Sequence, residues 1–160
     1  LPQVTHGGSM RYVIGRKNKH KKSEIISKYL EEEQKKKLDT IESCLDFKKA
    51  CELSKKMTIN KLNKLKKNNK KICGYAATAK STTVLNYCNI GNNIIDYICD
   101  TTKEKIGKFS PGAHIPIVSM EKFYEDMPDV AFLFAWNHKQ EIFSPEFHKC
   151  ECICCRYQSN

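Results

Sequence analysis

The chain has 160 residues, of which 40% are hydrophobic, 9% aromatic and 29% charged, so it is long enough for one domain with a core and too apolar to be disordered throughout. Its 28 Lys and Arg residues outnumber its 18 Asp and Glu residues, which gives a formal net charge of +10. No apolar run approaches the roughly 18 residues of a membrane span, and residues 1–10 lack the charged leader and apolar stretch of a secretory signal, so we expect a cytoplasmic protein.

The first half of the chain predicts a short strand and two helices. Residues 10–15 (MRYVIG) have the apolar, β-branched and aromatic content of a strand. A first helix is expected over residues 23–38, with Ser23 as its N-cap and apolar residues on one face. A second, Lys-rich helix is expected to run up to KKNNKK, because apolar residues recur near helical spacing. They are Phe47, Cys51, Met57, Leu62 and Leu65.

From residue 71 the chain changes to short apolar runs. Residues 71–77 (KICGYAA) and 93–100 (NIIDYICD) predict two strands. Between them, residues 81–91 (STTVLNYCNIG) predict a helix that closes on Gly91. Together they predict a β-α-β unit.

Two further apolar runs follow, at residues 115–120 (IPIVSM) and 129–136 (DVAFLFAW). Residues 121–127 predict a helical turn between them, and NHKQEIF begins a last helix. Apolar runs without polar alternation, separated by helices, are typical of a parallel sheet buried on both faces. We therefore predict an α/β fold with an open parallel sheet and flanking helices, preceded by a strand and a two-helix segment.

The turn after the first strand of this unit, GYAATAKS (residues 74–81), is a candidate anion site. Its small residues let backbone N–H groups approach a ligand, the next helix directs its positive end there, and Lys80 adds a charge. Neither the GxxxxGK[ST] nor the GxGxxG spacing is present. An ordinary tight turn is an equally good interpretation.

Three further side chains follow or precede predicted strands. Asp100 stands where dinucleotide folds place an acid for ribose hydroxyls, although an acid that caps the next segment is the better interpretation. His114 lies in a loop immediately before a predicted strand, and His138 follows the end of another. Histidine at such places can act as a general acid or base. A structural role is the more common one for a single loop histidine.

Nine cysteines are an odd number and most lie in apolar segments, so we expect reduced thiols and not a disulfide framework. The tail HKCECICC (residues 148–155) gathers soft ligands, yet its spacing matches neither a zinc ribbon nor a finger. We assign no metal site and expect a poorly ordered terminus.

The positive charge comes mainly from residues 16–22, 35–37 and 60–71, and it raises the hypothesis of nucleic-acid binding. An overall abundance of Asn and Lys explains the charge equally well. The basic runs also lack the interleaved aromatics of a stacking platform, so nucleic acid is the least favoured partner.

Several longer strings, taken in order, resemble one family. THGGSMRYVIGRK, GYAATAKSTTVLNYCNI, IDYICDTTKEKIGKFSPGAHIPI and PDVAFLFAWNHKQEI are similar to the C-terminal part of the S-adenosylmethionine-dependent C-methyltransferases that act on nucleotide-linked deoxysugars. The resemblance runs from about Thr5 to Ile142. It implies a Rossmann-like C-terminal domain that closes over the active-site cleft and helps to position a nucleotide-sugar substrate.

The same resemblance implies what this chain lacks. The family's glycine-rich cofactor loop, its ribose-binding acid and its catalytic region belong to a central methyltransferase domain, for which no counterpart is found in these residues. We expect that domain to come from a missing segment or a separate chain, and the chain alone to be inactive and not to bind S-adenosylmethionine. The implied organisation is a remnant strand and basic linker (1–22), a two-helix segment (23–70), the Rossmann-like domain (71–143) and a divergent Cys-rich tail (144–160).

The resemblance also carries over candidate substrate-binding positions. They are His6, Gly7, Gly8, Ser9, Ala77, Thr78, Ala79, Lys80, Ser81, Asn86, His114, Trp136 and Asn137. After Phe143 the chain departs from its relatives, which usually end in a Gly-Gly-Lys turn and a last apolar strand, and this departure leaves the edge of the sheet undetermined.

Three hypotheses remain open from the sequence. The first is a substrate-positioning domain of a sugar C-methyltransferase, and the second is a stand-alone module that binds a nucleotide or another anion. The third is a basic nucleic-acid-binding protein.

Overall fold

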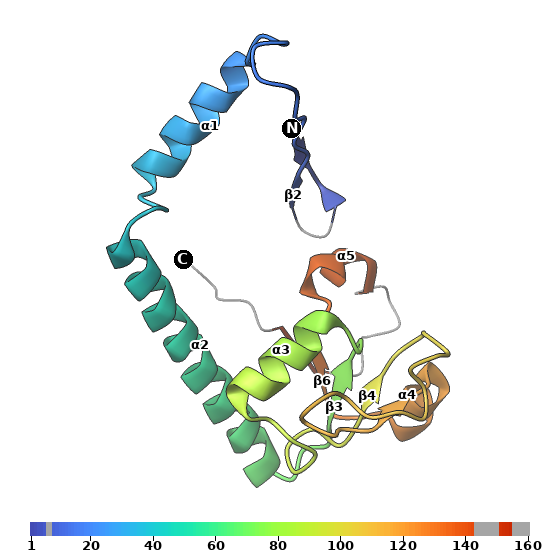
Figure 1. Cartoon of the computed structure of the whole chain (residues 1–160). Helices are drawn as coiled ribbons and strands as arrows, with labels where there is room; N and C mark the ends of the chain where they lie inside the picture. Colours follow the sequence, from blue (N-terminus) through green and yellow to red (C-terminus); the bar gives the residue numbers. More distant parts are fainter. Residues whose placement is uncertain (6–7, 143–150, 155–160) are drawn as a thin grey trace. The chain divides into compact units, whose positions relative to one another are not determined.

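The structure of the chain, a computed structural model, describes residues 1–5, 8–142 and 151–154 (Figure 1). It divides into two compact units, Leu1–Glu52 and Leu53–Asn160. The boundary falls inside the long helix α2, Ile41–Lys67.

The first unit begins with a small antiparallel hairpin. Strand β1, Pro2–Gln3, pairs with strand β2, Ser9–Met10, with Pro2 opposite Met10. The strand predicted over residues 10–15 is therefore wrong beyond Met10, and Ile14 is 92% exposed. An apolar segment forms a stable strand only where a neighbouring strand pairs with it, and β1 offers only two residues.

Both predicted helices are confirmed. Helix α1, Glu24–Lys35, starts after Ser23, whose side chain makes no cap hydrogen bond. It ends before the expected Leu38 because Lys37 adopts a left-handed conformation with φ 53°. Helix α2 starts at Ile41 after Thr40, whose Oγ1 accepts a hydrogen bond from the Ser43 N–H at 3.3 Å and so caps the helix.

The second unit contains a five-stranded sheet in the order β5-β4-β3-β6-β7, and every neighbouring pair is parallel. The predicted Rossmann-like α/β fold is confirmed. The strands are β3 (Ile72–Tyr75), β4 (Ile98–Cys99), β5 (Ile117–Val118), β6 (Val130–Leu133) and β7 (Glu151–Cys154). The helices that follow α2 are α3 (Ala79–Cys88), α4 (Met120–Asp126), the short 3-10 helix η2 (Trp136–His138) and α5 (Lys139–Ile142).

The strand order reverses at the centre of this sheet. From β3 the chain moves outward through β4 to β5, and it then returns to the other side of β3 as β6. Figure 1 shows β3 between β6 and β4. Such a reversal opens a crevice at the carboxyl ends of the two diverging strands, which is where ligands bind in open α/β sheets.

Side chains from alternate strand positions bury both faces of the sheet. Ile72 and Phe132 lie in a core cluster with Leu62 of α2 and Leu85 of α3. Cys73 lies in a second cluster with Phe123 of α4 and other residues. Helices on both faces explain why these strands read as continuous apolar runs.

Two boundaries differ from those expected. Of the predicted strand over residues 93–100, only Ile98 and Cys99 pair in the sheet, because Ile94 and Ile95 are apolar for burial in the core and not for strand pairing. Helix α3 ends at Cys88 and not at Gly91, since Asn89 takes the left-handed cap with φ 53°.

The edge of the sheet, which the sequence leaves undetermined, is formed by β7. Glu151–Cys154 runs parallel to β6, with Ala131 opposite Cys152. A strand in this tail is not expected from the sequence, because ECIC is short and carries a charged residue. Pairing with the fully buried β6 supplies the missing support.

Gly74 of β3 is packed so closely against its neighbours that a larger side chain there should destabilise the fold. A Cβ at position 74 would lie 2.8 Å from Phe134 Cε2 and 2.9 Å from Ile98 Cγ1. Because both neighbours are fully buried, Gly74→Ala is expected to lower the free energy of unfolding in urea by about 1–3 kcal/mol.

Gly91→Ala is the matched control. The nearest atom there is Asn93 Oδ1 at 3.2 Å, at the end of an exposed side chain that can move. If Gly74→Ala and Gly91→Ala unfold at the same urea concentration, the close packing at Gly74 is not as described.

Candidate functional site

The turn that joins β3 to α3, residues Ala76–Thr78, lies at the carboxyl end of the central strand; we call it the β3–α3 turn. The Ala76 N–H donates to the Cys99 carbonyl at 2.9 Å, and the Thr78 N–H donates to the Ala76 carbonyl at 3.0 Å. Ala76 has φ 72°, a left-handed conformation that costs a non-glycine residue about 1–2 kcal/mol. Such strain persists only where neighbouring groups hold the backbone in place.

Thr78 and Ser81 fix the start of α3. Thr78 Oγ1 accepts a hydrogen bond from the Ser81 N–H at 3.1 Å, and Ser81 Oγ donates to the Thr78 carbonyl at 2.6 Å. The N–H groups of Ala79 and Lys80 lie in the first turn, where a helix offers them no carbonyl. Helix α3 therefore presents amide donors and the positive end of its dipole at the carboxyl edge.

Asp100, which follows β4, holds the β3–α3 turn. The side chain is 6% exposed, and Oδ2 accepts hydrogen bonds from the Ala77 N–H at 2.7 Å and from Lys105 Nζ at 3.2 Å. Oδ1 accepts a hydrogen bond from the Thr102 N–H at 2.8 Å. The capping interpretation of Asp100 is confirmed, and its oxygens are engaged by the chain itself.

These contacts decide the ionisation state of Asp100. Burial by itself raises the pKa of the carboxyl group, but the hydrogen bonds from Thr102, the Ala77 amide and Lys105 together outweigh it, so the pKa is lowered from its ordinary value. Asp100 is therefore a carboxylate at neutral pH.

Lys80 connects the two strands that flank the strand-order reversal. It lies in the first turn of α3, after β3, and Nζ donates to Asn137 Oδ1 at 2.6 Å. The same ammonium lies 4.9 Å from the centre of the Trp136 ring, a cation–π contact. Trp136 and Asn137 belong to η2, which follows β6, so Lys80, Trp136 and Asn137 form one cluster at the carboxyl edge.

Asn86, another candidate, contacts the loop that contains the candidate His114. Asn86 is in the last turn of α3, and Nδ2 donates to the Pro111 carbonyl at 3.0 Å. His114 is exposed in the same loop, with φ 52°. Since a helix rises about 1.5 Å per residue, Asn86 lies about 9 Å along α3 from Lys80. Lys80 and Asn86 therefore lie at opposite ends of this helix.

The remaining candidates belong to the first unit. His6 and Gly7 lie outside the described residues. Gly8 has φ 125°, and Ser9 Oγ donates to the Thr5 carbonyl at 3.1 Å. Gly8 precedes β2 and Ser9 is its first residue.

Neither a metal site nor a membrane span is found in the part of the chain that the structure describes. There, no group of three or more His, Cys, Asp or Glu side chains is arranged to hold a metal ion. Of the Cys-rich tail, Cys152 and Cys154 lie on β7, whereas His148, Cys150 and Cys155 are outside the described residues. No helix among the described residues is long and apolar enough to cross a membrane.

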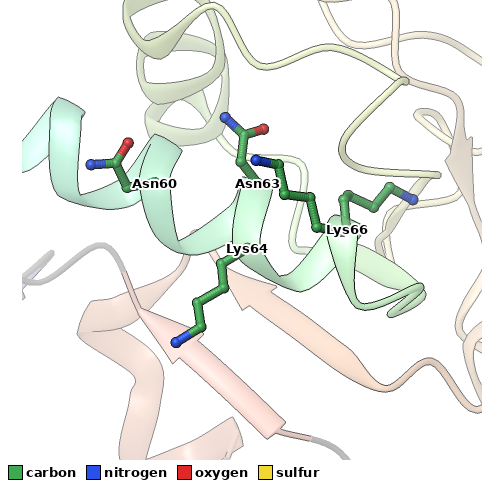
Figure 2. Close-up of a pocket in the computed structure, with 5 residues that line it drawn as sticks. Asn60, Asn63, Lys64 and Lys66 are labelled. Carbon is green, nitrogen blue, oxygen red and sulfur yellow. The ribbon is translucent and has the colours of Figure 1, made fainter.

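A hollow of about 470 Å³ lies along the last turns of α2 (Figure 2). All of its lining residues come from this one helix, and Figure 2 shows Asn63 and Lys64 pointing in opposite directions. A ligand site needs polar groups that converge. We therefore place the candidate site at the carboxyl edge of the sheet.

Lys105 and Thr102 contribute to this site without being predicted from the sequence. Both lie in TTKEKIG (residues 101–107), which carries no known motif for anion or metal binding. The available signal was positional, since they follow the acid at the end of a strand that neighbours the β3–α3 turn.

Comparison with known proteins adds two findings. Residues 4–151 match the family model described as the C-methyltransferase C-terminal domain. Over 77 residues the chain is 40% identical to the C-methyltransferase NovU of Streptomyces niveus, a match that covers 48% of this chain and 18% of that protein. The match thus covers well under two thirds of its relative's length.

Asp100→Ala removes the acceptor for three donors and leaves the partly buried Ala77 N–H without its partner. We expect the free energy of unfolding at pH 7 to fall by about 2 kcal/mol. Because the folded-state pKa is lowered, the stabilisation is present above the ordinary pKa of 3.8 and is lost as the pH falls below it. Urea unfolding between pH 3 and pH 7 measures this; a difference from wild type that stays constant with pH would contradict the account.

Ala76→Gly removes the Cβ from a left-handed residue, so we expect stability to stay unchanged or to rise by up to about 1 kcal/mol. Ala79→Gly, an exposed helical position, is the control and should lose about 0.5–1 kcal/mol. Equal losses in the two variants, measured by urea unfolding, would show that the backbone at Ala76 is not strained.

Proposed function

Because the chain belongs to the C-methyltransferase C-terminal domain family, we propose that it is the substrate-positioning domain of an S-adenosylmethionine-dependent C-methyltransferase. The proposed substrate is a nucleotide-linked deoxysugar. The chain is inactive without a central methyltransferase domain, which supplies the catalytic base and the cofactor site.

The observation that carries the proposal is the hydrogen bond from Lys80 Nζ to Asn137 Oδ1 at 2.6 Å. It joins the segments after β3 and β6, the two strands between which the order reverses. This is the edge where open α/β sheets bind ligands. A lysine, an asparagine and an indole ring at one place suit a nucleotide-sugar, which offers phosphate charges, hydroxyl groups and flat or apolar faces.

The side chains at this edge do not fit S-adenosylmethionine. A cofactor ribose is usually held by a carboxylate that follows a strand. Asp100 has that position, but its oxygens accept hydrogen bonds from Ala77, Thr102 and Lys105. A ribose would have to displace these donors from a buried group, which supports a cofactor site on another domain.

The chemistry assigned to the whole enzyme follows from C-methylation. A base removes the proton beside a sugar keto group, and the resulting enolate carbon takes the methyl group of the cofactor. The role proposed for this chain is to bind and orient the nucleotide-sugar. In a stand-alone anion-binding module, the second hypothesis, the same edge would bind the ligand without serving a methyltransferase.

The test is a thermal-shift panel on the full chain with thymidine diphosphate-glucose, S-adenosylmethionine and a short oligonucleotide. We expect only the nucleotide-sugar to raise the Tm, by about 5–10 °C at 100 times its Kd. Lys80→Met should abolish this shift because it removes the ammonium that the site holds. Lys103→Met, at an exposed position, should preserve it.

Each other result has a definite meaning. A shift with S-adenosylmethionine would contradict a cofactor site outside this chain. A shift with the oligonucleotide alone would favour nucleic-acid binding by the basic segments, residues 16–22, 35–37 and 60–71. An equal nucleotide-sugar shift in Lys80→Met and Lys103→Met would move the substrate site away from the carboxyl edge.

A further inference from the structure

Lys105 lies in the segment between β4 and β5 and reaches back to the β3–α3 turn. Its Nζ donates to the Ala77 carbonyl at 2.8 Å and to Asp100 Oδ2 at 3.2 Å. Ala77 is 28 residues earlier in the chain. The contact is therefore tertiary and links two loops at the carboxyl edge.

Lys105 and Asp100 hold both peptide groups that flank Ala77. The N–H of Ala77, which belongs to the preceding peptide, donates to Asp100 at 2.7 Å. The carbonyl of Ala77, which belongs to the following peptide, accepts from Lys105 at 2.8 Å. Since a peptide group is planar, fixing this carbonyl also fixes the direction of the Thr78 N–H.

The direction of Thr78 matters for the rest of the edge. Thr78 caps α3 through the Ser81 N–H, so a rotation of the Ala77–Thr78 peptide would move the cap. Lys80 follows two residues later in the first turn of α3. Ala76 has a strained conformation, with φ 72°. If the contacts that hold the turn are removed, relief of this strain favours rotation of its peptide groups.

The two partners of the Lys105–Asp100 ion pair differ in exposure to solvent. Asp100 is 6% exposed and Lys105 is 39% exposed. The lysine thus compensates a buried carboxylate while part of its side chain stays in solvent. A neutral side chain at position 105 would leave that carboxylate with Thr102 and the Ala77 N–H as its donors, and without a compensating positive charge.

We propose that Lys105 is a positioning residue for the nucleotide-sugar. It does not need to touch the substrate, because it acts by holding the β3–α3 turn, and through it the start of α3 and Lys80, in the orientation that binds the ligand. This inference rests on the proposed function of the same edge.

The experiment compares Lys105→Met, Lys105→Arg and the control Lys103→Met in the full chain. Amide hydrogen exchange followed by NMR reports the Ala77 and Thr78 N–H groups, and calorimetry well below the Tm gives the Kd for thymidine diphosphate-glucose. For Lys105→Met we expect exchange at Ala77 to be at least about tenfold faster and binding about tenfold weaker, as for a lost hydrogen bond from a charged group.

Lys105→Arg should recover most of both properties, because a guanidinium group can donate to a carbonyl and a carboxylate at once. A merely structural lysine would lower the Tm and leave the Kd of the folded chain unchanged, and that result would overturn the inference. Equal amide exchange rates at Ala77 in Lys105→Met and Lys103→Met would overturn the inference as well. Absence of binding by the wild-type chain would instead overturn the proposed function.

Discussion

The carboxylate of Asp100 is the constraint on which the carboxyl edge of the sheet depends. It lies at the end of β4 yet accepts the N–H of Ala77 at the end of β3, so one buried charge fixes how two neighbouring strands leave the sheet. A buried carboxylate is tolerated only with hydrogen-bonding partners. Those partners, Thr102 and Lys105, determine the path of the chain after β4.

Much of the second unit is predictable because its strands are buried on both faces. The apolar runs at residues 71–77 and 129–136 contain β3 and β6, since a fully covered strand needs apolar side chains at every position. The same reasoning overextends where apolar residues serve another purpose, as Ile94 and Ile95 do in the core. It fails for β7, whose pairing depends on the finished edge of β6.

The candidate site shows a similar division. Lys80, Trp136 and Asn137 come from motifs that resemble those of the family, and the structure brings the three together. Asn86 and His114 come from the same motifs, but Asn86 lies at the other end of α3 and donates to Pro111, in the loop that carries His114. Lys105 escapes sequence reasoning because its role depends on a contact 28 residues away.

The hydrogen bonds that Asp100 accepts from its own chain also bear on the proposed function. A dinucleotide-type sheet normally uses the acid at this place for a ribose, whereas here the acid stabilises its own turn. The domain has the α/β framework and presents amide donors at the carboxyl edge. Its Asp100, however, stabilises the β3–α3 turn. This arrangement supports the proposal made above, in which this domain binds the substrate and another domain binds the cofactor.

The most direct test of this account is an amide NMR titration of the full chain with thymidine diphosphate-glucose. The account predicts that chemical shifts change at Ala77–Lys80 and at the indole N–H of Trp136, and that they stay constant along residues 60–67 of α2. Changes confined to the lysines of α2, with none at Lys80 or Trp136, would contradict a substrate site at the carboxyl edge of β3 and β6.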